Sequence, residues 1–120
     1  MHIAVKEQKV MEKDHFYKGE GTIELRAAIG FGGVPTQEGS SVLSSMRMTI
    51  PAGASVGKHV HKGAEELYVV LSGKGLHTTE GQACEINPGD VINTKSGLEH
   101  SVKPVGDEPL VLQVSLIKSI

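Results

Sequence analysis

The chain has 120 residues, of which 38% are hydrophobic, 3% aromatic and 22% charged, and its formal net charge at pH 7 is -2. This length suits one domain with a single core, and the composition excludes both a disordered chain and a strongly basic nucleic-acid-binding protein. No apolar run is long enough to cross a bilayer, and the charged segment from Met1 to Lys13 does not resemble a secretory signal. We therefore expect a cytoplasmic protein whose partner is a small molecule rather than nucleic acid or a membrane.

The first third of the chain differs in character from the rest. Residues 1–40 mix charged side chains with one plausible strand, Gly21 to Ile29, followed by a loop from Gly30 to Ser40. We interpret this segment as an N-terminal arm that packs on the main domain or on a dimer partner. A strand added in this way would protect an exposed sheet edge.

From residue 41 to residue 120, short runs of valine, isoleucine, leucine and threonine alternate with glycine, proline, asparagine and aspartate. This spacing predicts an antiparallel all-β barrel or sandwich, and no segment has a helical period over a dozen residues. The expected strands are Val42 to Ile50, His59 to His61, Glu66 to Leu71, Gly75 to Thr79, Gln82 to Ile86, Val91 to Asn93, His100 to Val102 and Leu110 to Ile117.

The expected strand from Glu66 to Leu71 is apolar on both faces. Its period of two places Tyr68 and Val70 on one face, and the opposite face carries Leu67, Val69 and Leu71. One face should meet the barrel interior and the other a second sheet or a second subunit. The last strand is also apolar, and together these surfaces predict a homodimer. Its apolar residues are Val111, Val114, Leu116 and Ile117.

Two histidines in one expected strand carry the clearest chemical signal. His59 and His61, at positions i and i+2, point to the same face of a strand. Glu66 follows after the turn-like sequence Lys62 to Ala64, and a hairpin there would bring its carboxylate beside the two imidazoles. A buried carboxylate and imidazoles are costly without partners, whereas a divalent cation satisfies them together. The alternative for the pair alone is an exposed, polar stretch of chain.

The wider pattern resembles a known family. The segment GASVGKHVHKGAEELYVVLSG, from Gly53 to Gly73, is similar at every specified position to the first cupin motif, G-x5-H-x-H-x4-E-x6-G. The resemblance implies that His59, His61 and Glu66 are metal ligands. It also implies a small single-domain cupin, with an antiparallel jelly-roll β-barrel (a double-stranded β-helix) over residues 41–120.

The second cupin motif, G-x5-P-x-G-x2-H-x3-N, is matched less completely. INPGDVINTKSGLEHSVKP keeps Gly97 and His100 but has Lys95 in place of the proline and Pro104 in place of the asparagine. Neither replaced residue coordinates metal in the family, so the resemblance still implies His100 as the fourth ligand. Among relatives, the chain looks most like stand-alone cupins that resemble half of an oxalate decarboxylase or a sugar-phosphate isomerase.

The implied cofactor is one divalent transition-metal ion, and the donor set suits manganese, iron, nickel, cobalt or zinc alike. Three roles follow from it: an enzyme acting on a small organic acid or sugar, of decarboxylase, dioxygenase or isomerase type; a non-catalytic module that binds a small molecule or a metal; and a purely structural ion. Oxalate decarboxylases carry an arginine three residues before the first ligand histidine, where this chain has Val56. That particular reaction is therefore disfavoured.

Three further residues are candidates for a substrate pocket. Tyr68 shares a strand face with Glu66 and can orient a ligand through its hydroxyl, or simply pack in the core. His77, on the neighbouring hairpin strand, either reaches the cavity as an acid or base or lies on the surface. Arg47 either pairs with an acidic substrate or is a solvated strand residue.

Overall fold

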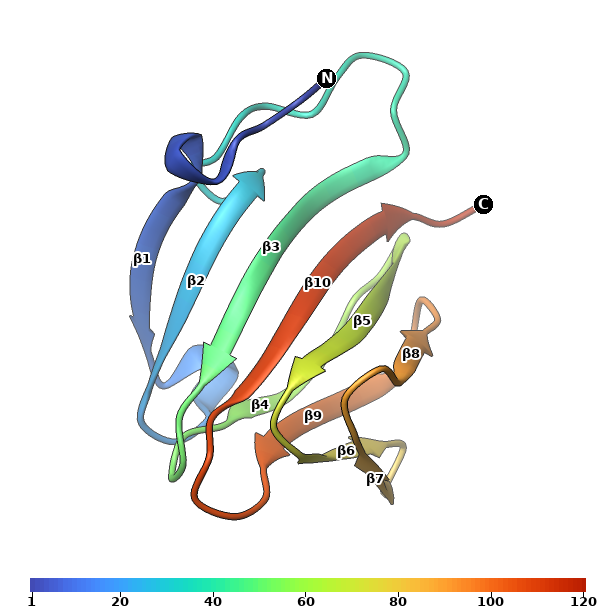
Figure 1. The fold of residues 1–120 in the computed structure, drawn as a ribbon. Coiled ribbons are helices and arrows are strands. Elements are labelled where there is room, and N and C mark those ends of the chain that lie inside the picture. Colours follow the sequence, from blue (N-terminus) through green and yellow to red (C-terminus); the bar gives the residue numbers. More distant parts are fainter.

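A computed structural model describes residues 1–120 as two antiparallel β-sheets that face each other (Figure 1). The larger sheet has the strand order β1-β2-β3-β10-β5-β8, and the smaller has the order β4-β9-β6-β7. This arrangement confirms the predicted all-β antiparallel barrel. None of the helices is long and apolar enough to cross a membrane. The strands are β1 (Lys9–Asp14), β2 (Thr22–Ile29), β3 (Val42–Ile50), β4 (Val56–Val60), β5 (Ala64–Ser72), β6 (Gly75–Thr79), β7 (Gln82–Ile86), β8 (Val91–Thr94), β9 (Glu99–Pro104) and β10 (Leu110–Lys118).

The N-terminal segment adds two strands to the larger sheet. β2 pairs with β3, as the strand predicted from Gly21 to Ile29 allows, and β1 pairs with β2 at the sheet edge. β1 was not predicted, because its sequence is charged and only Met11 packs against the core. Two short 3-10 helices flank β1: η1 (Val5–Glu7) and η2 (Phe16–Lys18).

The core lies between the sheets, and its largest part comes from alternate residues of β2, β3, β5 and β10. β5 buries Ala64, Glu66, Tyr68 and Val70, while the residues between them are less buried. The same period of two operates in β2, β3 and β10, so the inward rows of four adjacent strands form one continuous surface. The core cluster contains Ile23, Leu25, Ala27, Met46, Met48, Ile50, Ala54, Val56, Tyr68, Val70, Ile86, Val102, Leu110, Leu112 and Val114.

The outward face of the larger sheet is less apolar than its sequence suggested. Val114 belongs to the core, and Leu116 lines the cavity between the sheets, so neither adds to an outer surface. On β5, Leu67 and Val69 are half-buried and Leu71 is exposed, and no second sheet of this chain covers them. The alternation of β10 places Val114 inward because its neighbours Gln113 and Ser115 take the outward positions.

Candidate metal centre

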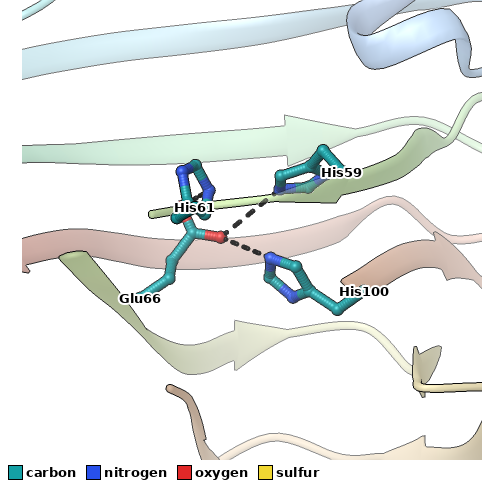
Figure 2. A group of neighbouring side chains, drawn as sticks. All are labelled: His59, His61, Glu66 and His100. Atoms are coloured by element: carbon teal, nitrogen blue, oxygen red, sulfur yellow. Dashed lines mark ion pairs between the residues drawn. The ribbon is translucent and has the colours of Figure 1, made fainter. Parts of the chain in front are cut away.

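Four side chains converge between the two sheets (Figure 2), and three of them come from one short stretch of chain while His100 is remote in sequence. His59 lies on β4, His61 follows that strand directly, Glu66 lies on β5 and His100 on β9. One nitrogen or carboxylate oxygen from each lies within 4.8 Å of all the others. The carboxylate oxygens of Glu66 are 3.1 Å from His100 Nε2, 3.3 Å from His61 Nε2 and 3.8 Å from His59 Nε2. The structure thus brings together all four residues that the sequence pattern assigns to a metal.

The pairing of β4 with β9 positions the histidines. The register of this pair shifts between Val56 and His59, so both residues are buried although they are three positions apart. His59 lies directly opposite His100 in the ladder, which places two imidazoles side by side. The ring of His61 follows at a centroid distance of 4.9 Å from that of His59.

The turn that ends at β5 brings Glu66 into the cluster. Gly63 has a φ of 77°, a conformation that favours glycine, and Glu66 is buried on the inward face after this turn. The predicted hairpin is wrong, however, because β4 pairs with β9 whereas β5 lies between β10 and β8. The chain crosses from one sheet to the other at this point. Glu66 therefore meets the imidazoles across the interior rather than from a neighbouring strand.

Three of the ligand atoms are buried without a hydrogen-bond partner: His61 Nε2, Glu66 Oε1 and His100 Nε2. The distances between these residues are short, but none of the contacts has the geometry of a hydrogen bond. Each unpartnered buried polar atom costs about 1–3 kcal/mol. Because imidazole nitrogens and a carboxylate are donors that divalent transition metals accept, one such ion can satisfy all three atoms. The residues therefore fit a metal site.

The carboxyl group of Glu66 is ionised in this setting. Burial on its own raises its pKa, but contacts with the imidazoles of His100, His59 and His61 outweigh burial and hold the pKa well below its usual range. The cluster consequently contains a buried anion, which suits a cationic occupant.

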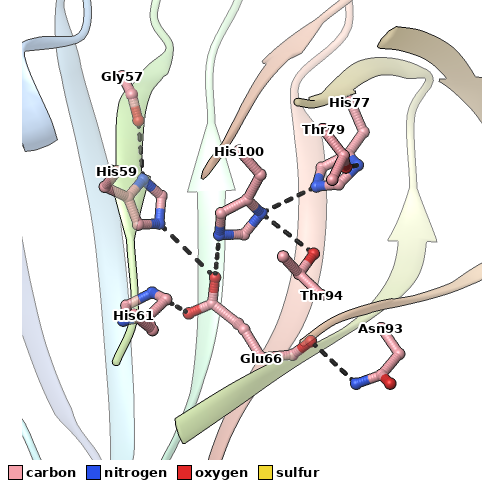
Figure 3. A network of polar contacts seen from close by, with 9 residues as sticks. All are labelled: Gly57, His59, His61, Glu66, His77, Thr79, Asn93, Thr94 and His100. Atoms are coloured by element: carbon pink, nitrogen blue, oxygen red, sulfur yellow. Dashed lines mark hydrogen bonds and ion pairs between the residues drawn. The ribbon is translucent and has the colours of Figure 1, made fainter. Parts of the chain in front are cut away.

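Contacts behind the cluster fix which nitrogen of His59 carries its proton (Figure 3). The Nδ1 atom of His59 is 2.8 Å from the carbonyl oxygen of Gly57. A carbonyl can only accept, so Nδ1 carries the hydrogen. Nε2, which faces Glu66, is left with its lone pair free for a metal.

A second histidine lies behind His100. The Nδ1 atom of His100 is 2.9 Å from Nε2 of His77 and 3.3 Å from Oγ1 of Thr94. For His100 to coordinate a metal through Nε2, Nδ1 must carry the hydrogen and donate it to His77. His77 then carries its own hydrogen on Nδ1 and donates it to Oγ1 of Thr79, 3.2 Å away.

His77 therefore contacts the candidate ligand His100 from behind, and it is not among the residues that line the cavity between the sheets. The histidine is buried, so the alternative of a surface position is wrong. Burial, together with the neighbouring His100, lowers the pKa of His77 to about 4. It is neutral at pH 7, as an acceptor of the His100 hydrogen must be.

Tyr17 lies against the cluster although no sequence motif pointed to it. Its ring stacks on that of His59, with the centroids 4.0 Å apart and the planes 9° from parallel. The tyrosine sits in η2 with a φ of 51°. A Cβ atom at Gly57 would lie 2.0 Å from the Tyr17 carbonyl oxygen, so only glycine at position 57 lets η2 come this close. The motif begins at Gly53, and nothing in the spacing of earlier residues marks Tyr17.

A cavity of about 50 Å³ adjoins the cluster, and His59, His61 and Glu66 line part of it. Tyr68 also lines the cavity, and burial and the Glu66 charge raise its pKa, so its hydroxyl keeps its proton. Arg47 does not reach the cavity, which corrects its assignment to a substrate pocket. It is exposed on the outward face of β3, because its neighbours Met46 and Met48 take the inward positions.

Comparison with known proteins places these features in context. A family model described as a cupin domain matches residues 46–117. A stretch of 64 residues is 42% identical to the oxalate-binding protein of Thermotoga maritima and covers 53% of each chain. A stretch of 95 residues is 30% identical to a gentisate 1,2-dioxygenase of a Ralstonia species and covers 78% of this chain and 26% of that one. The matched segment thus spans about half of the first relative and about a quarter of the second.

The same fold occurs in a solved structure. A Thermotoga maritima protein described as a predicted oxalate decarboxylase superposes with a TM-score of 0.85 at 28% identity, over 99% of this chain and 100% of that chain. The superposition therefore includes both sheets, with the N-terminal strands β1 and β2. Since the family model covers more than half of the chain and includes all four clustered residues, the protein belongs to the cupin domain family.

Proposed function

We propose that this cupin binds one divalent transition-metal ion through His59, His61, Glu66 and His100 and captures a small organic acid on that ion. The observation that carries the proposal is the group of buried ligand atoms at one point, three of which have no hydrogen-bond partner within the protein. The ion is manganese, iron, nickel, cobalt or zinc, all of which accept a set of three nitrogens and one carboxylate.

The chain's own residues prepare the site for such an ion. The Gly57 carbonyl holds the hydrogen of His59 on Nδ1, which leaves Nε2 of His59 free. Nε2 of His77 lies where it can accept a hydrogen from Nδ1 of His100, the arrangement that coordination through Nε2 of His100 requires. Glu66 contributes a negative charge that burial does not neutralise. When bound, the ion supplies Lewis-acid polarisation of oxygen donors in a ligand.

The choice of a small acid over a sugar is supported by the relatives. Two of them are named for oxalate and gentisate, which are both small organic acids. Oxalate decarboxylation itself remains disfavoured, since Val56 stands where the decarboxylases carry an arginine. A role toward a sugar, or a purely structural ion, is the weaker alternative.

The residues that line the cavity favour binding of an acid over a reaction in which a side chain acts as acid or base. Its titratable lining groups are Tyr17, Tyr68 and the three cluster residues His59, His61 and Glu66. Both tyrosines have raised pKa values and stay protonated, and the other three groups are assigned to the metal. No side chain remains as a general base. Dioxygenase-type turnover is the second candidate, favoured by the 30% identity to a gentisate dioxygenase over 78% of this chain.

Metal analysis of protein purified without a His-tag tests the site. Wild type should contain, or take up, close to one equivalent of metal, and His59→Ala and His100→Ala should each lose it. Oxalate should then bind only to the metal-loaded wild type. A folded wild type that cannot be loaded with any of the five metals would overturn the proposal.

We further propose that two copies associate through the outward face of β5 and β10, as the sequence led us to expect. Leu67 and Val69 on β5 and Val111 on β10 are half-buried on this face without a covering element of the same chain. A cytoplasmic location stays a prediction from the sequence.

A further inference from the structure

The cavity beside His59, His61 and Glu66 lacks the basic side chains that a site for an acid would ordinarily provide. No lysine or arginine is among its lining residues. Apart from the cluster itself, its polar groups are the hydroxyls of Tyr17, Ser44 and Tyr68, and the remaining walls are apolar side chains such as those of Met46 and Phe31. Any negative charge on a ligand must therefore be balanced at the metal.

We infer that the ligand is a short monocarboxylic acid with a hydroxyl or oxo group on the carbon next to the carboxylate and a small apolar tail. This inference rests on the proposed function, because it assigns the carboxylate and the neighbouring oxygen to the bound ion. The tail then lies in the apolar cavity. A second carboxylate or a phosphate on the tail would be buried without a cation to pair with it, which is strongly unfavourable.

The size of the cavity limits the tail. A volume of about 50 Å³ accommodates roughly two to four water-sized groups. Tyr17 closes one side, since its ring is stacked on His59 and held there by the close contact of η2 with Gly57. Phe31 also lines the cavity and is 43% exposed, so it forms part of the rim that faces solvent. A tail of one to three carbons fits these walls, and a sugar phosphate does not.

Two acids that present the same chelating groups to a metal, but differ in the charge of the tail, test this inference. 2-Hydroxybutanoate and malate share the same carboxylate, hydroxyl and first methylene, and they differ in a terminal methyl group or a terminal carboxylate. Titration of the metal-loaded protein by calorimetry should give at least roughly tenfold tighter binding of 2-hydroxybutanoate. Oxalate, whose adjacent carboxylates can both reach the ion, serves as a control for a site open to chelators.

A variant at the rim of the cavity tests whether an added positive charge allows a second carboxylate to bind. Phe31→Arg adds the missing cation at an exposed position, so it should strengthen malate binding severalfold relative to 2-hydroxybutanoate. Phe31→Gln removes the ring without adding charge and should leave the preference for 2-hydroxybutanoate in place. Malate binding as tightly as 2-hydroxybutanoate to the wild type would overturn this inference alone. Metal-loaded protein that binds none of the three acids would overturn the proposed function as well.

Discussion

His77 is a buried histidine that contacts the proposed metal ligand His100 and does not line the cavity between the sheets. When His100 coordinates the proposed ion through Nε2, its Nδ1 carries the hydrogen, and Nε2 of His77 lies where it accepts that hydrogen. His77→Leu removes this acceptor, and we expect metal affinity to fall by about 10–100-fold. Competition with a chromogenic chelator measures the change directly.

His77→Gln is the matched control for that experiment. A glutamine presents a carbonyl oxygen that can accept the hydrogen of His100, so this variant should recover most of the lost affinity. Nitrogen chemical shifts of His100 in the metal-free protein give an independent reading, because they report which ring nitrogen carries the hydrogen. An unchanged metal affinity and unchanged shifts in His77→Leu would mean that Thr94 alone positions His100.

At the scale of elements, the contact between η2 and β4 joins the N-terminal segment to the site. Gly57 of β4 leaves room for the Tyr17 carbonyl oxygen, and a Cβ atom there would lie 2.0 Å from it. Gly57→Ala should therefore displace η2 and the Tyr17 ring, at a cost of about 1–3 kcal/mol of unfolding free energy. Denaturant unfolding measures the cost.

Lys58→Ala is the control in the same strand, since Lys58 is exposed and its truncation should change stability by less than about 0.5 kcal/mol. A Gly57→Ala variant as stable as Lys58→Ala would show that η2 is not held by this contact.

The elements differ in how far the sequence determines them. The predicted strands from Val42 to Ile50, Gly75 to Thr79 and Gln82 to Ile86 agree with β3, β6 and β7 residue for residue, because turn residues in the adjacent sequence mark where they begin and end. β1 lies at an edge, and its charged sequence carries no such alternation. The hairpin expected between β4 and β5 was wrong because the choice of strand partner depends on contacts remote in sequence, which a turn sequence does not contain.

In the site, too, some residues were predictable from the sequence and others were not. The resemblance to the two cupin motifs named His59, His61, Glu66 and His100 as ligands, and the structure places these four side chains close enough together to share one ion. The positions of Tyr17 and His77 were not predictable in this way. Tyr17 reaches the cluster only through the packing of η2 on β4, and His77 reaches His100 only through the pairing of β6 with β9.

For the whole molecule, the uncovered outward face of the larger sheet predicts a homodimer. The outward residues Leu67 and Val69 of β5 lie beside Ser115 and Gln113 of β10, so the face mixes apolar and polar groups as non-obligate interfaces do. A stable dimer through this face would bury about 1,200–2,000 Å² in total. Sedimentation velocity at micromolar concentration should then show the mass of two chains.

Charge placed on that face should separate the copies. Val69→Lys puts an ammonium group at the centre of the proposed interface and should shift the protein to monomer, because a buried unpaired charge opposes association. Glu12→Lys introduces the same side chain on β1, an exposed edge position of the same sheet that lies four strands away from β5. It should leave the dimer intact. A wild type that sediments as monomer would rule out the dimer, whereas a dimer that persists in Val69→Lys would place the interface on another surface, with the edge strands β1 and β8 as the next to test.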